Sequence, residues 1–516
     1  MSISKYPKNS QNQAVARSAT IISLATLVSR ILGFIRDVVI ARLFGIYIYA
    51  QAFVIAFRIP NLFRDMVAEG ASNAAIVPVL SEYSLKRSKE EFWELANLLL
   101  NILMVLLSII TIFGIIFSPL IVRMIAPGFI SSPEKLQATI NLNRIIFPYI
   151  LLIGLAVYAT AVLNSLKDFT VSALAPCFLN IAIIICAMLF GENVKGLAAG
   201  VLIGGILQLA VQIPVLYKKG FRPKFALCFN HPGVVQVKRL MLPRLASSGI
   251  YQLNNFVDSI FGSLVAIVGD GGVAVLYFAY RLIQFPIGIF SNAIAQAILP
   301  TFSTQVLEEN HDELKATLSW GLRIVFFLML PITAIFMVLA QPLVFTLFGG
   351  GKFDFSSGLL TANALFFYSI GLSAYGGTKI LQSCFFALKD TVTPTKIAGL
   401  ALGINIILNL ALMFPLKIGG LALSTSISGI ITFLFLFFIL KRRLNGFEER
   451  KILSSFLRIF AASFCMAAVC FLVNRALNFA LALFFAALSY IVFCFIFRVT
   501  EFKELMQKSL WRTVRN

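Results

Sequence analysis

The sequence predicts an all-α, polytopic membrane protein of about 14 transmembrane helices. Two observations support this fold class. First, 59% of the 516 residues are hydrophobic and only 13% are charged, a composition that fits no soluble globular class. Second, apolar windows of roughly 20 residues, each long enough to cross a hydrocarbon core of about 30 Å, recur along the whole chain.

Connections of varied length separate the windows. The second, eighth and tenth are longer than one crossing, so we expect these helices to tilt, to kink at Pro60 or Pro286, or to extend into water. In chain order the windows cover residues 20–44, 47–80, 95–119, 142–164, 172–191, 196–217, 241–268, 272–300, 317–340, 358–387, 395–415, 418–440, 452–473 and 478–498.

The charged residues predict the topology. An even number of crossings places both termini on one side, and lysine and arginine concentrate in the termini and loops of that side, so the positive-inside rule makes both termini cytoplasmic. We attribute the net charge of +21 to this topology and to attraction for anionic membrane lipids, rather than to nucleic-acid binding. The first 20 residues lack the apolar core of a cleaved signal peptide.

A weak internal repeat divides the chain. "LNSLKDFTVSALAP" around Asp168 aligns with "FFALKDTVTPTKIA" around Asp390 at an offset of 222 residues, and the same offset aligns Pro78 with Pro300. Two halves of six helices each enter the membrane in the same orientation, because six is even. This parallel repeat is typical of alternating-access transporters.

The repeat predicts three parts. We expect an N-terminal lobe of six helices at 1–222 and a C-terminal lobe of six helices at 223–447. Residues 448–516 lie outside the repeat and form an accessory helix pair with a basic cytoplasmic tail. The apolar surface of this pair is expected either to hold a lipid tail or to serve packing alone.

Arginines inside apolar windows are the main candidates for a functional site. Near the bilayer centre each costs at least about 2.5–3.5 kcal/mol, so several together indicate a water-filled interior or an anionic ligand. We expect Asp37, Asp65 and Glu69 to pair with some of them, since an unpaired buried charge is prohibitive. An excess of guanidinium remains and suits a phosphate or pyrophosphate. The arginines are Arg30, Arg36, Arg58, Arg64 and Arg281.

The second window carries a polar stripe. Spacings of three and four residues place one set of side chains on a single helix face: Arg58, Asn61, Asp65, Glu69 and Ser72. Arg64 starts about 100° away from Asp65 around the helix axis. The alternative for each single arginine is a salt-bridged or snorkelling scaffold residue.

One acidic residue is a candidate ion site, and the histidines and a glycine-rich segment give no support for an enzyme. Asp258 lies in the seventh window and is a candidate sodium or proton site, or else makes a hydrogen bond between helices. His231 and His311 lie in loops without metal-ligand spacing, and "GGGKF" at 349–353 lacks the full phosphate-loop pattern. We therefore expect no enzyme, and energy from the membrane potential or an ion gradient.

Eight further segments occur in order along the chain: "SRILGFIRDVVIARLFG", "FRIPNLFRDMVAEGA", "VPVLSEY", "APGF", "FPYILLIGLA", "LNSLKDF", "FPIGIF" and "GKFD". Together they resemble the MurJ (MviN) family of lipid II flippases, in the multidrug/oligosaccharidyl-lipid/polysaccharide exporter superfamily. The resemblance covers most of residues 20–440 and implies fourteen helices in two six-helix lobes with a C-terminal pair. Some members carry an aspartate where this chain has Gln51 or Tyr280.

The resemblance also implies a substrate-binding set. The family's site residues fall on Ser29, Arg30 and Arg36 in the first window, on Asn61, Arg64 and Glu69 in the second, and on Arg281 in the eighth. Asp37 and Arg58 join this set from the residue pattern alone. Some members bind sodium near the seventh helix, which makes Asp258 the candidate position, and no other cofactor is expected.

The function implied is transport of lipid II, the undecaprenyl-pyrophosphate-linked peptidoglycan precursor, from the cytoplasmic to the outer leaflet of the bacterial inner membrane. Lipid II, anionic membrane lipids and the cell-wall synthesis machinery are the implied partners. The alternatives are a drug or cation antiporter of the same superfamily and a flippase for another lipid-linked oligosaccharide. An antiporter would be expected to centre its cavity on acids and aromatics, which the arginine excess disfavours.

Overall fold

The computed structural model describes residues 8–66 and 75–504. These residues form helices joined by short connections, and within them the only β-structure is an isolated bridge between Gly350 and Phe353. Nine of the described helices are long and apolar enough to cross a membrane, and a bent pair, Phe355–Ile370 with Leu372–Ala387, makes a tenth. The all-α, polytopic fold class predicted from the sequence is confirmed.

Each predicted window falls mainly on helical residues, with short breaks such as 147–148 and 263–264; residues 67–74 of the second window lie outside the described residues. The sequence predicts about 14 crossings, and three features explain why only nine or ten described helices qualify as spans. The 52-residue helix α19 (Val392–Arg443) contains two windows, because the backbone of Lys417 leaves the helical region at φ 51° and ψ −126° just after Pro415. The first and seventh windows lie on charged helices, and the second starts in a helix of only 17 residues.

The chain divides into two compact units, Met1–Ser263 and Leu264–Asn516. The predicted lobe boundary at 222–223 stays a prediction, because it refers to the repeat, whereas the units follow from packing: the long helix after residue 231 packs on the first unit. The first unit contains α1 (Lys8–Phe44), α2 (Ile48–Arg64), α3 (Val77–Lys86), α4 (Lys89–Ile116), α5 (Ser118–Ile125), the 3₁₀ turn η2 (Pro127–Ser131), α6 (Pro133–Ile146), α7 (Tyr149–Ser165), α8 (Thr170–Phe190), α9 (Val194–Ala210), α10 (Ile213–Lys219) and α11 (Pro232–Gly262).

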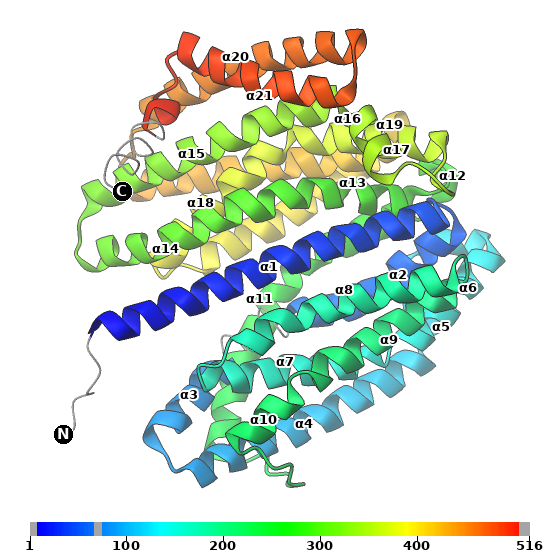
Figure 1. Cartoon of the computed structure of the whole chain (residues 1–516), viewed down its shortest axis with the longest axis vertical. Helices are drawn as coiled ribbons and strands as arrows, with labels where there is room; N and C mark the ends of the chain where they lie inside the picture. The colour runs from blue at the N-terminus through cyan, green and yellow to red at the C-terminus, as the bar shows by residue number, and fades with distance from the viewer. Residues whose placement is uncertain (1–7, 67–74, 505–516) are drawn as a thin grey trace. The chain divides into compact units, whose positions relative to one another are not determined.

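In the first unit α1 packs along α8, and α8 packs along α9 (Figure 1). Small residues allow the second contact: a side chain at Gly200 or Gly204 would meet the backbone of α8 at less than 3.0 Å. An apolar core joins α3, α4 and α7, and the buried Tyr158 donates its hydroxyl to the carbonyl of Ala96 at 2.5 Å. These contacts hold α1, α7 and α8, and α2 packs on α6 and α7; α1 and α2 carry most of the predicted site.

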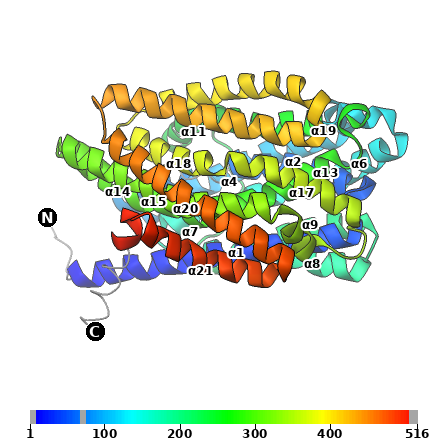
Figure 2. The ribbon, with the colours of Figure 1, turned by 90° about the horizontal axis from the view of Figure 1, so that it is seen from above.

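The second unit contains α12 (Val265–Val268), α13 (Gly272–Pro286), the π-helical turn η3 (Ile287–Ser291), α14 (Asn292–Leu307), α15 (His311–Val338), α16 (Ala340–Phe348), α17 (Phe355–Ile370), α18 (Leu372–Ala387), α19, α20 (Glu449–Ala476) and α21 (Phe479–Ile496). Asn310 and Asn478 cap α15 and α21 by accepting backbone N–H groups. The accessory pair α20 and α21 lies side by side, and α20 packs against α15 (Figures 1 and 2).

The repeated Leu-Lys-Asp segments have the same local structure. Lys167 and Lys389 both take left-handed φ angles, 60° and 59°, and the N–H groups of Asp168 and Asp390 both bond at 2.9 Å to a carbonyl five residues earlier. Each aspartate also pairs with a basic residue at or near the end of a later helix: Asp168 with Lys219 at 3.2 Å and Asp390 with Arg443 at 2.6 Å. This correspondence agrees with a parallel repeat.

Asp390 is expected to stabilise the protein in a pH-dependent way. Burial acts to raise its pKa, but hydrogen bonds from Thr393 and the Arg443 guanidinium outweigh burial and hold the pKa below the ordinary value of 3.8. A lowered carboxylate pKa gives stability that is present above the unfolded pKa and lost as the pH falls through the folded one.

Asp390→Ala should therefore lower the free energy of unfolding by about 1 kcal/mol at neutral pH, mainly through the lost helix cap. Denaturant unfolding in detergent should show the difference from the parent shrinking below pH 3.8. Asp390→Asn keeps an acceptor for the Thr393 N–H and should lose less. A constant difference down to pH 2 would contradict the linkage.

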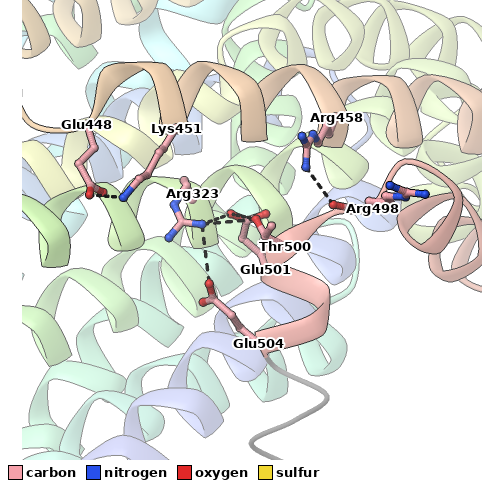
Figure 3. Close-up of polar contacts among 8 residues, drawn as sticks. All are labelled: Arg323, Glu448, Lys451, Arg458, Arg498, Thr500, Glu501 and Glu504. Atoms are coloured by element: carbon pink, nitrogen blue, oxygen red, sulfur yellow. Dashed lines mark hydrogen bonds and ion pairs between the residues drawn. The ribbon is translucent and has the colours of Figure 1, made fainter.

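A buried ion pair ties the segment after α21 to α15 (Figure 3). The Arg323 guanidinium reaches Glu501 at 2.5 Å, where Glu501 is fully buried and Arg323 is 14% exposed. Glu504 lies 3.9 Å from the same guanidinium and is 41% exposed. Near this pair, Arg458 of α20 donates to the carbonyl of Arg498 at 3.2 Å.

Glu501→Ala is expected to lower the free energy of unfolding by up to about 3–5 kcal/mol, because it removes the buried carboxylate and leaves the largely enclosed Arg323 with only the exposed Glu504 at 3.9 Å. Glu504→Ala removes an exposed partner of the same arginine and should cost at most about 1 kcal/mol. Denaturant unfolding of the purified full chain in detergent compares the two. Equal losses would show that burial of the pair does not decide its contribution.

Candidate functional site

Arg36 of α1 is the most enclosed of the predicted site arginines, 4% exposed. Its Nε and Nη2 both donate to Oδ1 of Asp37, at 3.0 and 2.8 Å, and Nη1 donates to Oδ1 of Asn180 on α8 at 3.1 Å. The guanidinium carbon also lies 5.6 Å from the ring centroid of Phe57 on α2. The pair therefore joins α1, α2 and α8.

Arg64, the last residue of α2, repeats this arrangement. Its Nε and Nη2 donate to Oδ1 of Asp65 at 3.0 and 2.9 Å, and Oδ2 of Asp65 accepts from Gln252 of α11 at 3.3 Å. The expected pairing of acids with arginines is thus observed, but between chain neighbours. The offset of about 100° does not prevent it, because the long arginine side chain curls back over its own helix.

The two arginines differ in exposure. The Arg64 side chain is 39% exposed and that of Asp65 28%, against 5% and 0% for Arg36 and Asp37. The ring of Tyr149 on α7 lies 6.0 Å from that of Phe57, the ring that Arg36 approaches from α1. Arg36 is thus the buried guanidinium of the site and Arg64 the accessible one.

The structure describes two of the four remaining positions of the polar stripe, Arg58 and Asn61. Arg58 donates to the Ser259 hydroxyl of α11, which gives α2 a second polar link to that helix. The side-chain oxygen of Asn61 is buried and has no hydrogen-bond partner among the described residues. Glu69 and Ser72 lie outside the described residues.

The other described members of the predicted substrate-binding set lie on α1 and α13. Arg30 is exposed, and the carbonyl of Ser29 accepts from Asn180 at 3.2 Å. Arg281 belongs to the second unit, where its guanidinium lies 6.0 Å from the Tyr277 ring. That Arg281 approaches the arginines of the first unit stays a prediction.

Asp258 is half-buried on α11, directly before Ser259. Among the described residues no three or more His, Cys, Asp or Glu side chains gather as a metal site. Sodium prefers oxygen ligands of several kinds, including backbone carbonyls, so the sodium or proton role of Asp258 stays a prediction.

Sequence reasoning missed four residues of this site: Phe57, Tyr149, Asn180 and Gln252. Asn180 had a usable signal, because it stands alone as a strongly polar residue in the apolar run "CFLNIAIIIC". Phe57 and Tyr149 had none, since an aromatic residue in an apolar helix is ordinary.

The described helices are long enough to span a bilayer, and the arginines of the site outnumber the carboxylates that pair with them. These two features define a multi-pass membrane protein with a cationic site. The model of the family "Lipid II flippase MurJ" matches residues 40–492. The chain is 37% identical over 437 residues to the probable lipid II flippase MurJ of Buchnera aphidicola subsp. Acyrthosiphon pisum, covering 84% of each chain. It is 35% identical over 439 residues to that of Vibrio cholerae serotype O1, covering 83% of each. The chain belongs to the lipid II flippase MurJ family.

Solved structures agree with this assignment. A lipid II flippase MurJ in an inward closed conformation superposes with a TM-score of 0.81 at 27% identity, and the match covers 94% of this chain and 100% of that one. An inward-facing MATE-family multidrug transporter of the MOP superfamily gives a TM-score of 0.67 at 15% identity, covering 84% of this chain and 99% of that one. The second match shows a shared fold alone.

Proposed function

We propose that this chain is a flippase that moves lipid II across the bacterial inner membrane. The observation that carries the proposal, beside family membership, is the charge of the described site: Arg30, Arg36, Arg58 and Arg64 exceed Asp37 and Asp65. Guanidinium groups in excess of carboxylates suit the pyrophosphate that joins the headgroup to the polyprenyl tail.

The geometry supports different roles for the two Arg-Asp pairs. Arg64 is accessible and can exchange Asp65 for a phosphate oxygen at small cost, with Gln252 keeping the released carboxylate hydrogen-bonded. Arg36 is enclosed, and we assign it the task of holding α1 and α8 in place beside the site while contributing its charge. Arg30, Arg58 and Asn61 extend the site, with Ser29, Glu69 and Arg281 as further members of the binding set.

The direction of transport is the one that the family resemblance implies, and the charge distribution gives the orientation of the chain. Both termini lie in the cytoplasm by the positive-inside rule, and the headgroup enters from the cytoplasmic leaflet while the tail stays in lipid. Alternating access then releases the headgroup at the outer leaflet. The membrane potential or a sodium gradient acting through Asp258 supplies the energy, and the cell-wall synthesis machinery supplies and consumes the lipid.

Translocation of lipid II by the reconstituted chain tests the proposal. Vesicles with and without an imposed potential or sodium gradient should show flipping, and one of the two gradients should accelerate it. A second polyprenyl-pyrophosphate oligosaccharide and a cationic drug serve as competitors, since they represent the two alternative functions. An assay for altered headgroup covers an enzymatic role. Transport of the drug without lipid II flipping would overturn the proposal.

A further inference from the structure

Residues 221–229, between α10 and α11, form an extended strap along α4. Asn97 of α4 holds its first part: Nδ2 donates to the carbonyl of Arg222 at 3.1 Å, and Oδ1 accepts the N–H of Lys224 at 2.8 Å. The Asn97 amide thus donates to one backbone carbonyl of the strap and accepts from one backbone N–H, the two kinds of hydrogen bond that a neighbouring β-strand would make.

Asn101, one turn further along α4, holds the next part of the strap. Its Nδ2 donates to the carbonyl oxygens of Lys224 at 2.7 Å and Ala226 at 3.1 Å. Phe221 anchors the start by packing into the buried core against Trp93, with ring centroids 5.7 Å apart. The strap is therefore attached along one backbone edge, and its other side is open.

The strap crosses α4 near the start of the membrane window of that helix. The exposed apolar surface of α4 begins at Met104 and continues to Ile116. The predicted window starts at residue 95, so Asn97 and Asn101 lie in its first two turns. The headgroup layer adds about 5–8 Å beyond the hydrocarbon core, so core and headgroups meet at this end of α4.

The open side of the strap combines apolar and basic groups. Phe225 and Leu227 are two residues apart on the strap, which places them on one side, and Phe229 follows in the turn before α11; the three are 82%, 42% and 64% exposed. Exposed Lys218, Arg222 and Lys224 flank them. Large exposed aromatics beside several cations are costly in water but suit the boundary between anionic headgroups and acyl chains.

We propose that this strap is an interfacial anchor that binds anionic lipid of the surrounding bilayer. The apolar trio enters the headgroup boundary, and the basic residues contact lipid phosphates. The anchor holds the connection between α10 and α11 at the membrane surface. It goes beyond the proposed flipping of lipid II, because the lipid it binds is bulk bilayer and not the transported cargo.

Cys228 provides the probe, since it is exposed and the other six cysteines are buried or half-buried. The purified full chain is labelled there with an environment-sensitive dye and reconstituted into vesicles of phosphatidylcholine with or without phosphatidylglycerol; Cys228→Ser gives the labelling background. With phosphatidylglycerol the dye should shift to the blue, be quenched by brominated lipid and resist aqueous iodide.

Two variants separate the contributions. Phe225→Ala with Leu227→Ala and Phe229→Ala should abolish the quenching by brominated lipid. Neutralising Lys218, Arg222 and Lys224 to glutamine should lower the ratio of docked to undocked strap roughly fivefold per residue, the equivalent of about 1 kcal/mol for each cation near an anionic surface. A matched control neutralises three exposed cations elsewhere, Arg442, Arg450 and Lys503, and should leave the signal unchanged.

Several results would overturn the anchor. One is full quenching of the Cys228 dye by iodide in both vesicle types. A second is quenching by brominated lipid that neither strap variant changes, or that the control variant lowers equally. A third is protection from iodide that requires added cytosolic protein instead of phosphatidylglycerol. The assay contains no lipid II. Its failure therefore leaves the proposed function standing, and failure of translocation leaves the anchor standing.

Discussion

Replacing Arg64 by alanine is expected to abolish lipid II translocation while the protein stays folded. Arg64 is 39% exposed and its partner Asp65 is 28% exposed, so loss of this ion pair should change the free energy of unfolding by no more than about 1 kcal/mol. The charge-assisted hydrogen bonds from its guanidinium to a pyrophosphate are worth about 1.5–3 kcal/mol each. Two such bonds correspond to roughly a hundredfold loss of rate or more.

Growth of cells depleted of their own flippase measures this effect in vivo, and the vesicle assay measures it in vitro. Arg64→Lys keeps the charge but loses the planar fork of donors, so it should retain only part of the activity. Arg144→Ala removes another exposed arginine of the first unit and serves as the matched control. Normal growth and normal flipping with Arg64→Ala would remove this arginine from the binding site.

The sequence predicted the helical fold and the arginine cluster because both depend on composition and on short-range periodicity. Apolar windows identify membrane helices from the cost of exposed backbone in lipid, and this cost holds in any tertiary context. The same argument makes an arginine inside such a window conspicuous before its surroundings are known.

The pairing within the site could not be predicted in the same way. Arg36 bonds Asn180, 144 positions later, only because α1 and α8 pack in a particular register, which is a tertiary property. Helix-wheel angles also did not predict the contact between Arg64 and Asp65. They describe where a side chain starts, whereas a guanidinium lies several bonds further out and can fold back.

Arg36 and Asp37 allow the structural and functional roles of a site arginine to be separated. Arg36→Ala should abolish complementation, and it should also lower the free energy of unfolding by about 3–5 kcal/mol, because Asp37 is fully buried and would lose its counter-charge. Loss of growth in this variant alone therefore cannot distinguish a missing ligand contact from a missing protein.

The double variant Arg36→Met with Asp37→Leu separates the two roles. Apolar residues of similar volume often replace a buried ion pair without loss of stability, so the double variant should unfold at nearly the parent denaturant concentration. If Arg36 supplies charge for the pyrophosphate, this stable protein should still fail to flip lipid II in vesicles and to support growth. Recovery of transport together with stability would instead make the pair a scaffold and leave Arg30, Arg58 and Arg64 as the cations that meet the substrate.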